Sequence, residues 1–305
     1  MTPEVASNAA IKVGVVANTK KLPTSMVRDL KKAFDEAGFR HVRWSTVEKG
    51  SDAKAAAEKA IERGVDVVMA CGGDGTVRAA AEALVHTGVP LAVMPAGTAN
   101  LFASAMHIPR APAEAVALLH SGSLRTIDTA TCNGMTFQIM AGAGFDAAMI
   151  DAADDDKERL GPVAYLRAGV QQAKGRTPFE VRVDVDGETM FEGAATCVLV
   201  GNIGTLRAGL RAFPDASPTD GLLDIGVITA TGLREWGRLM ITAVRQRQQW
   251  SGHAHLAQGH DVEVTFDSKH RFELDGGVKG RSKKLRLAVD PASLVVCAPP
   301  ESANP

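Results

Sequence analysis

The stretch Cys71-Gly72-Gly73-Asp74-Gly75-Thr76 lies between an apolar run that predicts a buried strand, Val65–Ala70, and a helical pattern, Val77–Val85. Glycines at such a turn let the backbone approach a ligand closely, and the free amides at a helix start attract phosphate. Asp74 adds a carboxylate of the kind that holds Mg²⁺ beside phosphates. The alternative is a tight strand-to-helix turn in which Asp74 serves only as the N-cap.

The sequence on either side predicts a parallel sheet covered by helices. Ile11–Ala17 is the expected first strand, Thr24 is expected to cap a helix that ends before Gly38, and Ser51 is expected to open another that stops at Gly64. A second turn, Pro95-Ala96-Gly97-Thr98-Ala99-Asn100, follows the next predicted strand. Because neighbouring parallel strands deliver their C-terminal loops to one crevice, both turns are expected to line one nucleotide site.

The second half of the chain has a different pattern. From about Thr126 apolar residues alternate with polar ones, and Asn133-Gly134 predicts a tight hairpin, so this half reads as antiparallel. Two helical patterns, 157–173 and 233–250, interrupt the strands, and the last strands are expected at Leu285–Val289 and Leu294–Ala298. We therefore expect two domains, 8–125 and 126–300, with the C-terminal strand as a candidate to return to the first.

Composition limits the classes of partner. The chain has 305 residues, 45% of them hydrophobic, and a formal net charge of −1, which is typical of a soluble globular protein and removes the electrostatic argument for nucleic acid. The four cysteines are too far apart for a CxxC pair and favour a reducing, cytosolic setting. No secretory signal or membrane-spanning helix is expected, so a membrane would be met from its surface.

The two turns together resemble those of a known family. GGDGT followed about twenty residues later by P-x-G-T-x-N is similar to the diacylglycerol kinase catalytic-domain superfamily, which includes sphingosine, ceramide and bacterial lipid kinases, with NAD kinases as more distant relatives. The resemblance covers nearly the whole chain. The later blocks that carry it are Gly144-Phe145-Asp146-Ala147, Gly161-Pro162-Val163-Ala164-Tyr165, Pro214-Asp215-Ala216, Asp220-Gly221-Leu222-Leu223-Asp224 and Leu274-Asp275-Gly276.

The resemblance implies an α/β nucleotide-binding domain with a parallel sheet, joined to an antiparallel β-sandwich-like domain, with ATP and lipid meeting in the cleft between them. It implies a structural Mg²⁺ at Ser217, Asp220 and Leu222, with backbone carbonyls serving at the two non-acidic positions, although Asp220-Gly221 alone would read as a turn. The positions expected to contact the nucleotide and its metal are Asn18, Thr46, Gly72, Gly73, Asp74, Gly75, Thr76, Arg78, Gly97, Thr98, Asn100 and Asp128.

The sequence departs from the family at the catalytic base. The family has Asp-Gly-Glu, whereas this chain has Asp275, Gly276 and Gly277. A general base contributes ~10²–10⁴-fold, so activity could survive at a lower rate, with Asp275 as the substitute base or Glu273 on the same strand face. The alternative is that Asp275-Gly276 only makes a hairpin turn. The Asn18-Thr19-Lys20-Lys21 stretch and Arg78 also differ from the usual residues and bring cations near the expected phosphates.

The expected function is transfer of the γ-phosphate of ATP, with Mg²⁺, to a hydroxyl of a diacylglycerol-like lipid, with Asp74 and Asp275 as the catalytic residues. We expect a cytoplasmic enzyme, peripheral to the inner face of the membrane, whose partners are a nucleotide and a lipid; a homodimer stays open. Two alternatives remain: a non-catalytic nucleotide or lipid sensor, because of Gly277, and an NAD kinase, because that family shares GGDGT.

Overall fold

The computed structural model describes residues 10–121, 123–144, 178–204, 212–232, 234–235 and 252–300. The chain divides into two compact units: unit 1 is Met1–Ile127 with Ala292–Pro305, and unit 2 is Asp128–Pro291. The predicted helix 157–173 lies outside the described residues, as does nearly all of the one predicted over 233–250.

Unit 1 contains a parallel sheet. Its strands run in the order β2-β1-β3-β4, and the end of β14 (Gly277–Ala298) pairs in parallel with β4, with Val296 opposite Leu91. The strands are β1 (Lys12–Asn18), β2 (His41–Val47), β3 (Val67–Gly72) and β4 (Leu91–Pro95). The helices are α1 (Thr24–Glu36), α2 (Ala53–Glu62) after the 3-10 turn η1 (Gly50–Asp52), α3 (Asp74–Leu84), α4 (Leu101–Ala105) and α5 (Pro112–Ser121).

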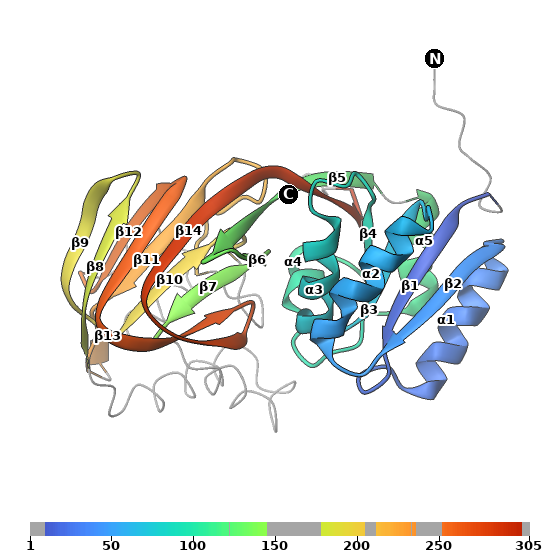
Figure 1. Ribbon diagram of the computed structural model, residues 1–305, viewed down its shortest axis with the longest axis horizontal. Coiled ribbons are helices and arrows are strands. Elements are labelled where there is room, and N and C mark those ends of the chain that lie inside the picture. Colours follow the sequence, from blue (N-terminus) through green and yellow to red (C-terminus); the bar gives the residue numbers. More distant parts are fainter. Residues whose placement is uncertain are drawn as a thin grey trace, which may run out of the picture. The chain divides into compact units, whose positions relative to one another are not determined.

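Helices cover both faces of this sheet (Figure 1). On one face, Leu30 and Phe34 of α1 pack against Val13 and Val15 of β1, because apolar residues three and four apart share a helix side. On the other face Gly14 meets α2 so closely that a Cβ there would lie 2.9 Å from the Ala60 Cβ. One local prediction is wrong: the N-cap of α1 is Pro23, with no side-chain cap, and Thr24 is already helical.

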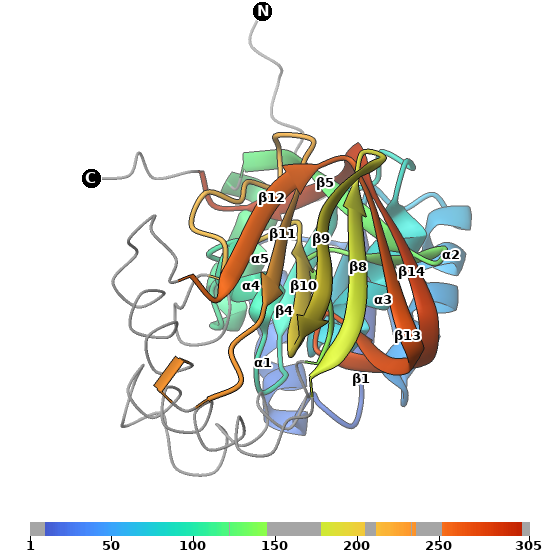
Figure 2. The same cartoon turned by 90° about the vertical axis from the view of Figure 1, so that its left-hand side faces the viewer.

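Unit 2 is built from antiparallel strands (Figure 2). One series runs β12-β11-β10-β7-β13, while β13 also pairs with β14 and with β8, which pairs with β9; β5 pairs with β14 and with β6. The strands are β5 (Ser123–Cys132), β6 (Met135–Phe137), β7 (Met140–Ala143), β8 (Phe179–Val185), β9 (Glu188–Ala195), β10 (Cys197–Gly201), β11 (Leu223–Ile228), β12 (Ala254–Gly259) and β13 (Asp261–Leu274).

The long strand β13 serves both sheets of a sandwich. Its residues 262–266 pair with β8 and its residues 272–274 pair with β7, with a register shift between Thr265 and His270. Such an irregularity lets a strand bend from one sheet into another. The core between the sheets includes Val183 of β8 and Ile225 of β11, which point inward because alternate residues share a face. The expected β-sandwich-like fold of the second half is confirmed.

The strands of unit 2 are joined by tight turns. Asn133-Gly134, Asp186-Gly187 and Asp275-Gly276 each pair two residues of positive φ, the backbone conformation that two-residue hairpins need. The last two predicted strands are one continuous strand, β14, in which Ala292 has a φ of +48°. This strand begins in unit 2 and ends in unit 1.

Candidate functional site

The turn between β3 and α3 presents backbone amides. Gly73 is the N-cap of α3 and has no side chain to cap the first turn, while its carbonyl accepts hydrogen bonds from the Thr76 and Val77 amides at 2.8 and 3.1 Å. The interpretation of Asp74 as the N-cap is therefore wrong, because Asp74 lies inside the first turn. A helix start that lacks a capping side chain is suited to an anion.

The two predicted loops meet through their glycines. A Cβ at Gly97 would lie 2.4 Å from the Gly73 Cα, and the Ala96 amide donates to the Gly72 carbonyl at 2.8 Å. Side chains at these two glycines would push the loops apart. The sequence-based expectation that both turns reach one crevice is therefore matched by their backbone contact.

One side chain fixes the second loop, and one backbone amide orients Asp74. Asn100 has a φ of +49°; its Oδ1 accepts from the Gly97 amide at 2.8 Å and its Nδ2 donates to the Gly97 carbonyl at 2.7 Å. The Asp74 Oδ1 accepts a hydrogen bond from the Phe102 amide, at the start of α4, at 3.2 Å. Asp74 is thus held by the neighbouring loop, so a change in either loop alters the placement of this carboxylate.

Asn18, at the end of β1, belongs to the same cluster. Its buried Nδ2 donates to the Thr76 Oγ1 at 3.0 Å, and its Oδ1 accepts from the Lys20 amide at 3.1 Å. Thr46 is exposed on β2 beside Ala17, one residue before Asn18, and Thr98 is exposed in the second loop. The structure therefore places Asn18 and Thr46, like the two glycine loops, at the carboxyl ends of the strands of unit 1.

One close approach was missed by the sequence reasoning. Gly50, in η1, packs so near the turn that a Cβ there would lie 3.1 Å from the Gly75 carbonyl carbon. The available signal was a glycine just before a predicted helix that opens beside the same sheet edge.

Arg78, predicted as a phosphate ligand, pairs with Glu82 at 3.3 Å, and Glu82 also accepts a hydrogen bond from Lys54 at 2.9 Å.

The predicted carboxylates of unit 2 are held by backbone amides. The buried Asp128 donates its amide to the Pro218 carbonyl at 2.7 Å, and its Oδ2 accepts from the Gly221 amide at 2.8 Å. Asp128 is therefore tied to the loop that carries Ser217, Asp220 and Leu222.

Asp275 occupies the hairpin turn between β13 and β14. Its Oδ1 accepts from the Ile139 and Met140 amides at 2.8 and 3.0 Å, and its Oδ2 accepts from the Gln138 amide at 3.1 Å. Hydrogen bonds of this kind stabilise the ionised form of a carboxylate. The turn that the alternative interpretation expected is present, and a catalytic role for Asp275 stays a prediction.

The donors expected to hold a structural Mg²⁺ are all oxygen atoms. Asp220 offers a carboxylate whose Oδ1 accepts from the Leu222 amide at 3.0 Å, while Ser217 and Leu222 offer backbone carbonyls. Oxygen donors suit Mg²⁺, so the residues present fit this ion. Among the residues that the structure describes, no group of three or more His, Cys, Asp or Glu side chains could hold a metal, so this loop would depend on its carbonyls.

Asp224, just beyond that loop, is buried with 7% of its surface exposed. Its Oδ1 accepts a hydrogen bond from the Gln258 Nε2 at 3.1 Å. Burial, and to a lesser extent the charges of Asp220 and Asp215, raise the pKa of Asp224 to about 6, against an opposing contribution from Gln258. Asp224 therefore changes charge near pH 6.

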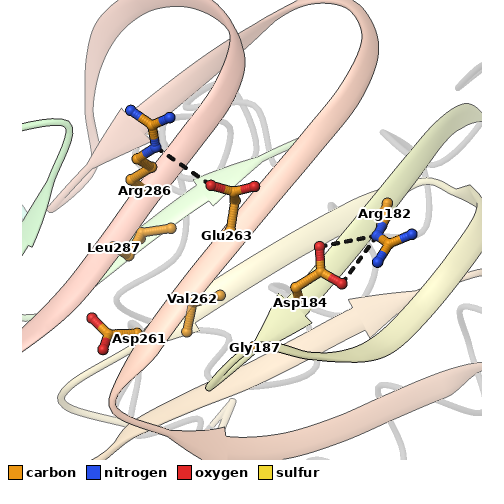
Figure 3. A pocket seen from close by; sticks show the side chains of 8 residues that line it. All are labelled: Arg182, Asp184, Gly187, Asp261, Val262, Glu263, Arg286 and Leu287. Atoms are coloured by element: carbon orange, nitrogen blue, oxygen red, sulfur yellow. Dashed lines mark hydrogen bonds and ion pairs between the residues drawn. The ribbon is translucent and has the colours of Figure 1, made fainter.

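A groove of about 430 Å³ lies on the outer face of β8, β13 and β14 (Figure 3). Arg182 and Asp184 pair at 3.0 Å, and Arg286 pairs with Glu263 at 3.4 Å. Each guanidinium in the groove thus has a carboxylate partner within it. Paired charges of this kind are typical of a solvated sheet face. None of the predicted site residues lines the groove.

Other features limit the chemistry. All four cysteines are free and buried, and burial raises the pKa of Cys132 and Cys297 to about 12, so these two thiols stay protonated at neutral pH.

None of the described helices is long and apolar enough to cross a membrane. Parts of the family-like blocks, Phe145–Ala147 and Gly161–Tyr165, lie outside the described residues.

Comparison with known families gives two matches that together span most of the chain. Residues 12–132 match a family described as the diacylglycerol kinase catalytic domain. Residues 139–298 match a family described as the YegS C-terminal NAD kinase beta sandwich-like domain. The first match contains the paired glycine loops, and the second contains Asp220 and Asp275.

Individual relatives agree with these matches. A Pseudomonas aeruginosa protein named "Probable lipid kinase YegS-like" is 34% identical over 301 residues, 94% of each chain. A Bacillus subtilis protein named "Diacylglycerol kinase" is 31% identical over 251 residues, 81% of this chain and 82% of the relative. A crystal structure described as a diacylglycerol kinase from Bacillus anthracis has a TM-score of 0.72 at 21% identity, covering 95% of this chain and 97% of that one, which supports the fold.

Proposed function

Since the chain belongs to the diacylglycerol kinase family, we propose that it transfers the γ-phosphate of ATP to a hydroxyl group of a diacylglycerol-like lipid. The lipid oxygen attacks the γ-phosphorus, the bond from that phosphorus to the β–γ bridging oxygen breaks, and ADP leaves. The hydroxyl proton passes to a base of the protein. The observation that carries the proposal is the pair of glycine loops joined at Gly73 and Gly97.

Unit 1 would bind the triphosphate. Because Gly73 has no side chain to cap α3, the amides at the start of this helix would face the phosphates. The glycines on both loops would let the phosphates lie against the backbone. Mg²⁺, when bound, neutralises charge that develops on the transferred phosphoryl group. Asp74 is the residue of this loop that would hold it, and the Phe102 amide keeps its carboxylate in place.

Unit 2 would supply the groups that act on the acceptor. Asp275 is the proposed base, and the three amide hydrogen bonds to its carboxylate fix its direction. Asp128 would extend the phosphate and metal network, and Ser217, Asp220 and Leu222 would hold a structural Mg²⁺. The acceptor lipid would be met at the cytoplasmic membrane surface, because its apolar chains keep it in the bilayer.

The test is transfer of labelled γ-phosphate from ATP, with Mg²⁺, into a total-lipid extract, followed by mass spectrometry of the labelled product. Asp74→Ala is expected to lower transfer by about 10³-fold, because it removes charge stabilisation from the metal. Asp275→Asn is expected to lower it by about 10²-fold, the lower limit for a general base. Circular dichroism of both variants checks that the fold is retained.

Each outcome separates the proposal from its alternatives. A labelled lipid whose yield collapses in Asp74→Ala supports the lipid kinase and identifies the acceptor. Binding of ATP without transfer to any lipid would instead indicate a sensor, in agreement with Gly277. Transfer to NAD but to no lipid would indicate an NAD kinase.

A further inference from the structure

Asn202, which follows β10, lies at the centre of a buried hydrogen-bonded network in unit 2. Its side chain has 0% exposure. Its Nδ2 donates to the backbone carbonyls of Asp128, at 2.9 Å, and Gln138, at 3.0 Å. Its own amide donates to the Ile139 carbonyl at 2.9 Å. One residue thus contacts two segments that lie far from it in the sequence.

Each of these segments carries one of the carboxylates already described. Asp128 is bonded to the Pro218 carbonyl and the Gly221 amide of the predicted Mg²⁺ loop. The segment 138–140 supplies the three amides that hold the Asp275 carboxylate. The path from Asp128 to Asp275 therefore runs through the Asn202 side chain and a single short segment.

The chemistry of the contact explains why the residue is an asparagine. Two carbonyl oxygens converge on one nitrogen, and the uncharged NH₂ group of asparagine has two N–H donors, one for each carbonyl. The Asn202 Oδ1 is buried and has no hydrogen-bond partner among the described residues, so in this part of the chain the residue acts through its donors. An aspartate of the same shape would place oxygen against both carbonyls.

We propose that Asn202 is a positioning residue that fixes Asp128 and Asp275 relative to one another. The structural part of this inference stands on the contacts above, and its catalytic consequence rests on the proposed kinase function. Because small displacements of catalytic groups are costly, loss of the two donors is expected to lower kcat by about 10- to 100-fold. The KM for ATP is expected to change less than kcat does, because the glycine loops proposed to bind most of the triphosphate belong to unit 1, whereas Asp128 is the only proposed nucleotide contact among the two carboxylates.

The test compares Asn202→Leu with Thr196→Val. Leucine has nearly the shape of asparagine without its donors. Thr196 is the matched control: it is buried, it precedes the same strand, and its Oγ1 lies 3.1 and 2.9 Å from the Ile228 and Ala230 carbonyls, away from both carboxylates. Hydrogen exchange of the full chain would be measured at the amides that bind the two carboxylates, which are Gln138, Ile139, Met140 and Gly221.

Asn202→Leu is expected to speed exchange at these amides by at least about 10-fold relative to amides elsewhere in unit 2, because their carboxylate partners lose their fixed position. Thr196→Val is expected to leave the ratio unchanged. Equal ratios in the two variants would overturn the proposal. This arm needs no activity, so it decides the matter even if the wild-type chain transfers no phosphate and the proposed function fails. Where Asn202→Leu does not fold, Asn202→Ser, which keeps one donor, takes its place.

The kinetic arm uses a double-mutant cycle. In the Asp275→Asn background, Asn202→Leu is expected to cause a smaller further loss of kcat than in the wild-type background, because one of the two carboxylates that it positions is already inactive. A further loss as large as in the wild-type background would show that Asn202 does not act through Asp275. A fall in kcat equal to that of Thr196→Val would reduce its role to stability.

Discussion

The glycine loops of unit 1 and the carboxylate network of unit 2 present chemistry in opposite ways. In unit 1 the backbone is the proposed ligand-facing surface, and side chains are excluded where Gly73 and Gly97 meet. In unit 2 the side chains of Asp128 and Asp275 are the proposed functional groups, and backbone amides of other segments hold them. We therefore expect ligand binding at the first site to be sensitive to any added atom. We expect the chemistry of the second site to be sensitive to the identity of single side chains.

Apart from the loss of Asp74, the largest effect is expected at Gly277, where unit 2 lacks a side chain. Gly277→Glu restores the carboxylate of the family pattern, and a Cβ there would lie at ordinary contact distance, 3.5 Å from the Leu274 carbonyl oxygen and 3.6 Å from the Lys279 Nζ, so a Cβ fits. A general base contributes ~10²–10⁴-fold, and kcat is expected to rise about 100-fold, the lower end, because the nearby ammonium lowers the basicity of the new carboxylate. Steady-state lipid phosphorylation measures the change.

Gly277→Gln is the control for that gain, because it has the same shape without the charge. It is expected to leave kcat within about twofold of the wild type. A kcat for Gly277→Glu no higher than that of Gly277→Gln would show that the missing glutamate does not limit the rate. The base role would then stay with Asp275 or another group, and the contrast between the two units would be weaker than proposed.

The two sites also differ in how far the sequence alone could predict them. The loops of unit 1 are two short stretches at the ends of neighbouring strands, so local patterns predicted both the turns and their meeting. The network of unit 2 joins residues from Asp128 to Asp275 through Asn202, and no local pattern predicts a contact across so many residues. The family resemblance supplied the carboxylates, but the amides that hold them became visible only in the fold.

The same reasoning explains the smaller errors. Whether α3 begins before or after Asp74 depends on which residue is the N-cap, and that residue is Gly73. The continuity of β14 through Pro291 and Ala292 depends on a positive φ at Ala292 that the sequence does not announce. Neither an exact helix boundary nor a positive φ at an alanine can be read from local sequence preference.

In unit 1 the next largest effect is expected from Gly97→Ala. Its Cβ would fall 2.4 Å from the Gly73 Cα, and backbone at that distance must move. Overpacking of this kind displaces both loops, so ATP affinity is expected to fall about 50-fold, measured by isothermal titration calorimetry. Gly134→Ala, in the β5–β6 hairpin, is strained by its φ of +79° but remote from the loops, and it is expected to lower stability without changing ATP affinity. An unchanged ATP affinity in Gly97→Ala would show that the contact between Gly73 and Gly97 does not shape an ATP site.

A pH experiment tests the side-chain character of unit 2. The pKa of Asp224 is raised to about 6 in the folded chain from an ordinary value of 3.8. The folded state therefore holds this proton more tightly, and the contribution of Asp224 to stability is lost as the pH rises from about 4 through 6. Relative to Asp224→Asn, the wild type is expected to lose on the order of 2 kcal/mol of unfolding free energy over that range. Urea titrations with a chelator measure it, and parallel curves for the two proteins would contradict it.

The smallest effect is also the sharpest test of the glycine loops, because affinity and stability should move in opposite directions. Gly75 has open space around its missing Cβ and lies in the first turn of α3. Gly75→Ala should therefore raise the thermal midpoint slightly, since alanine favours a helix by about 0.5–1 kcal/mol. If phosphates occupy that open space, the added methyl meets them, and ATP affinity falls about 10-fold. Gly64→Ala, beyond the end of α2, has equally open space but a φ of +67°, and it should lower stability while leaving ATP affinity unchanged. A Gly75→Ala chain that binds ATP as tightly as the wild type would move the phosphates away from this turn.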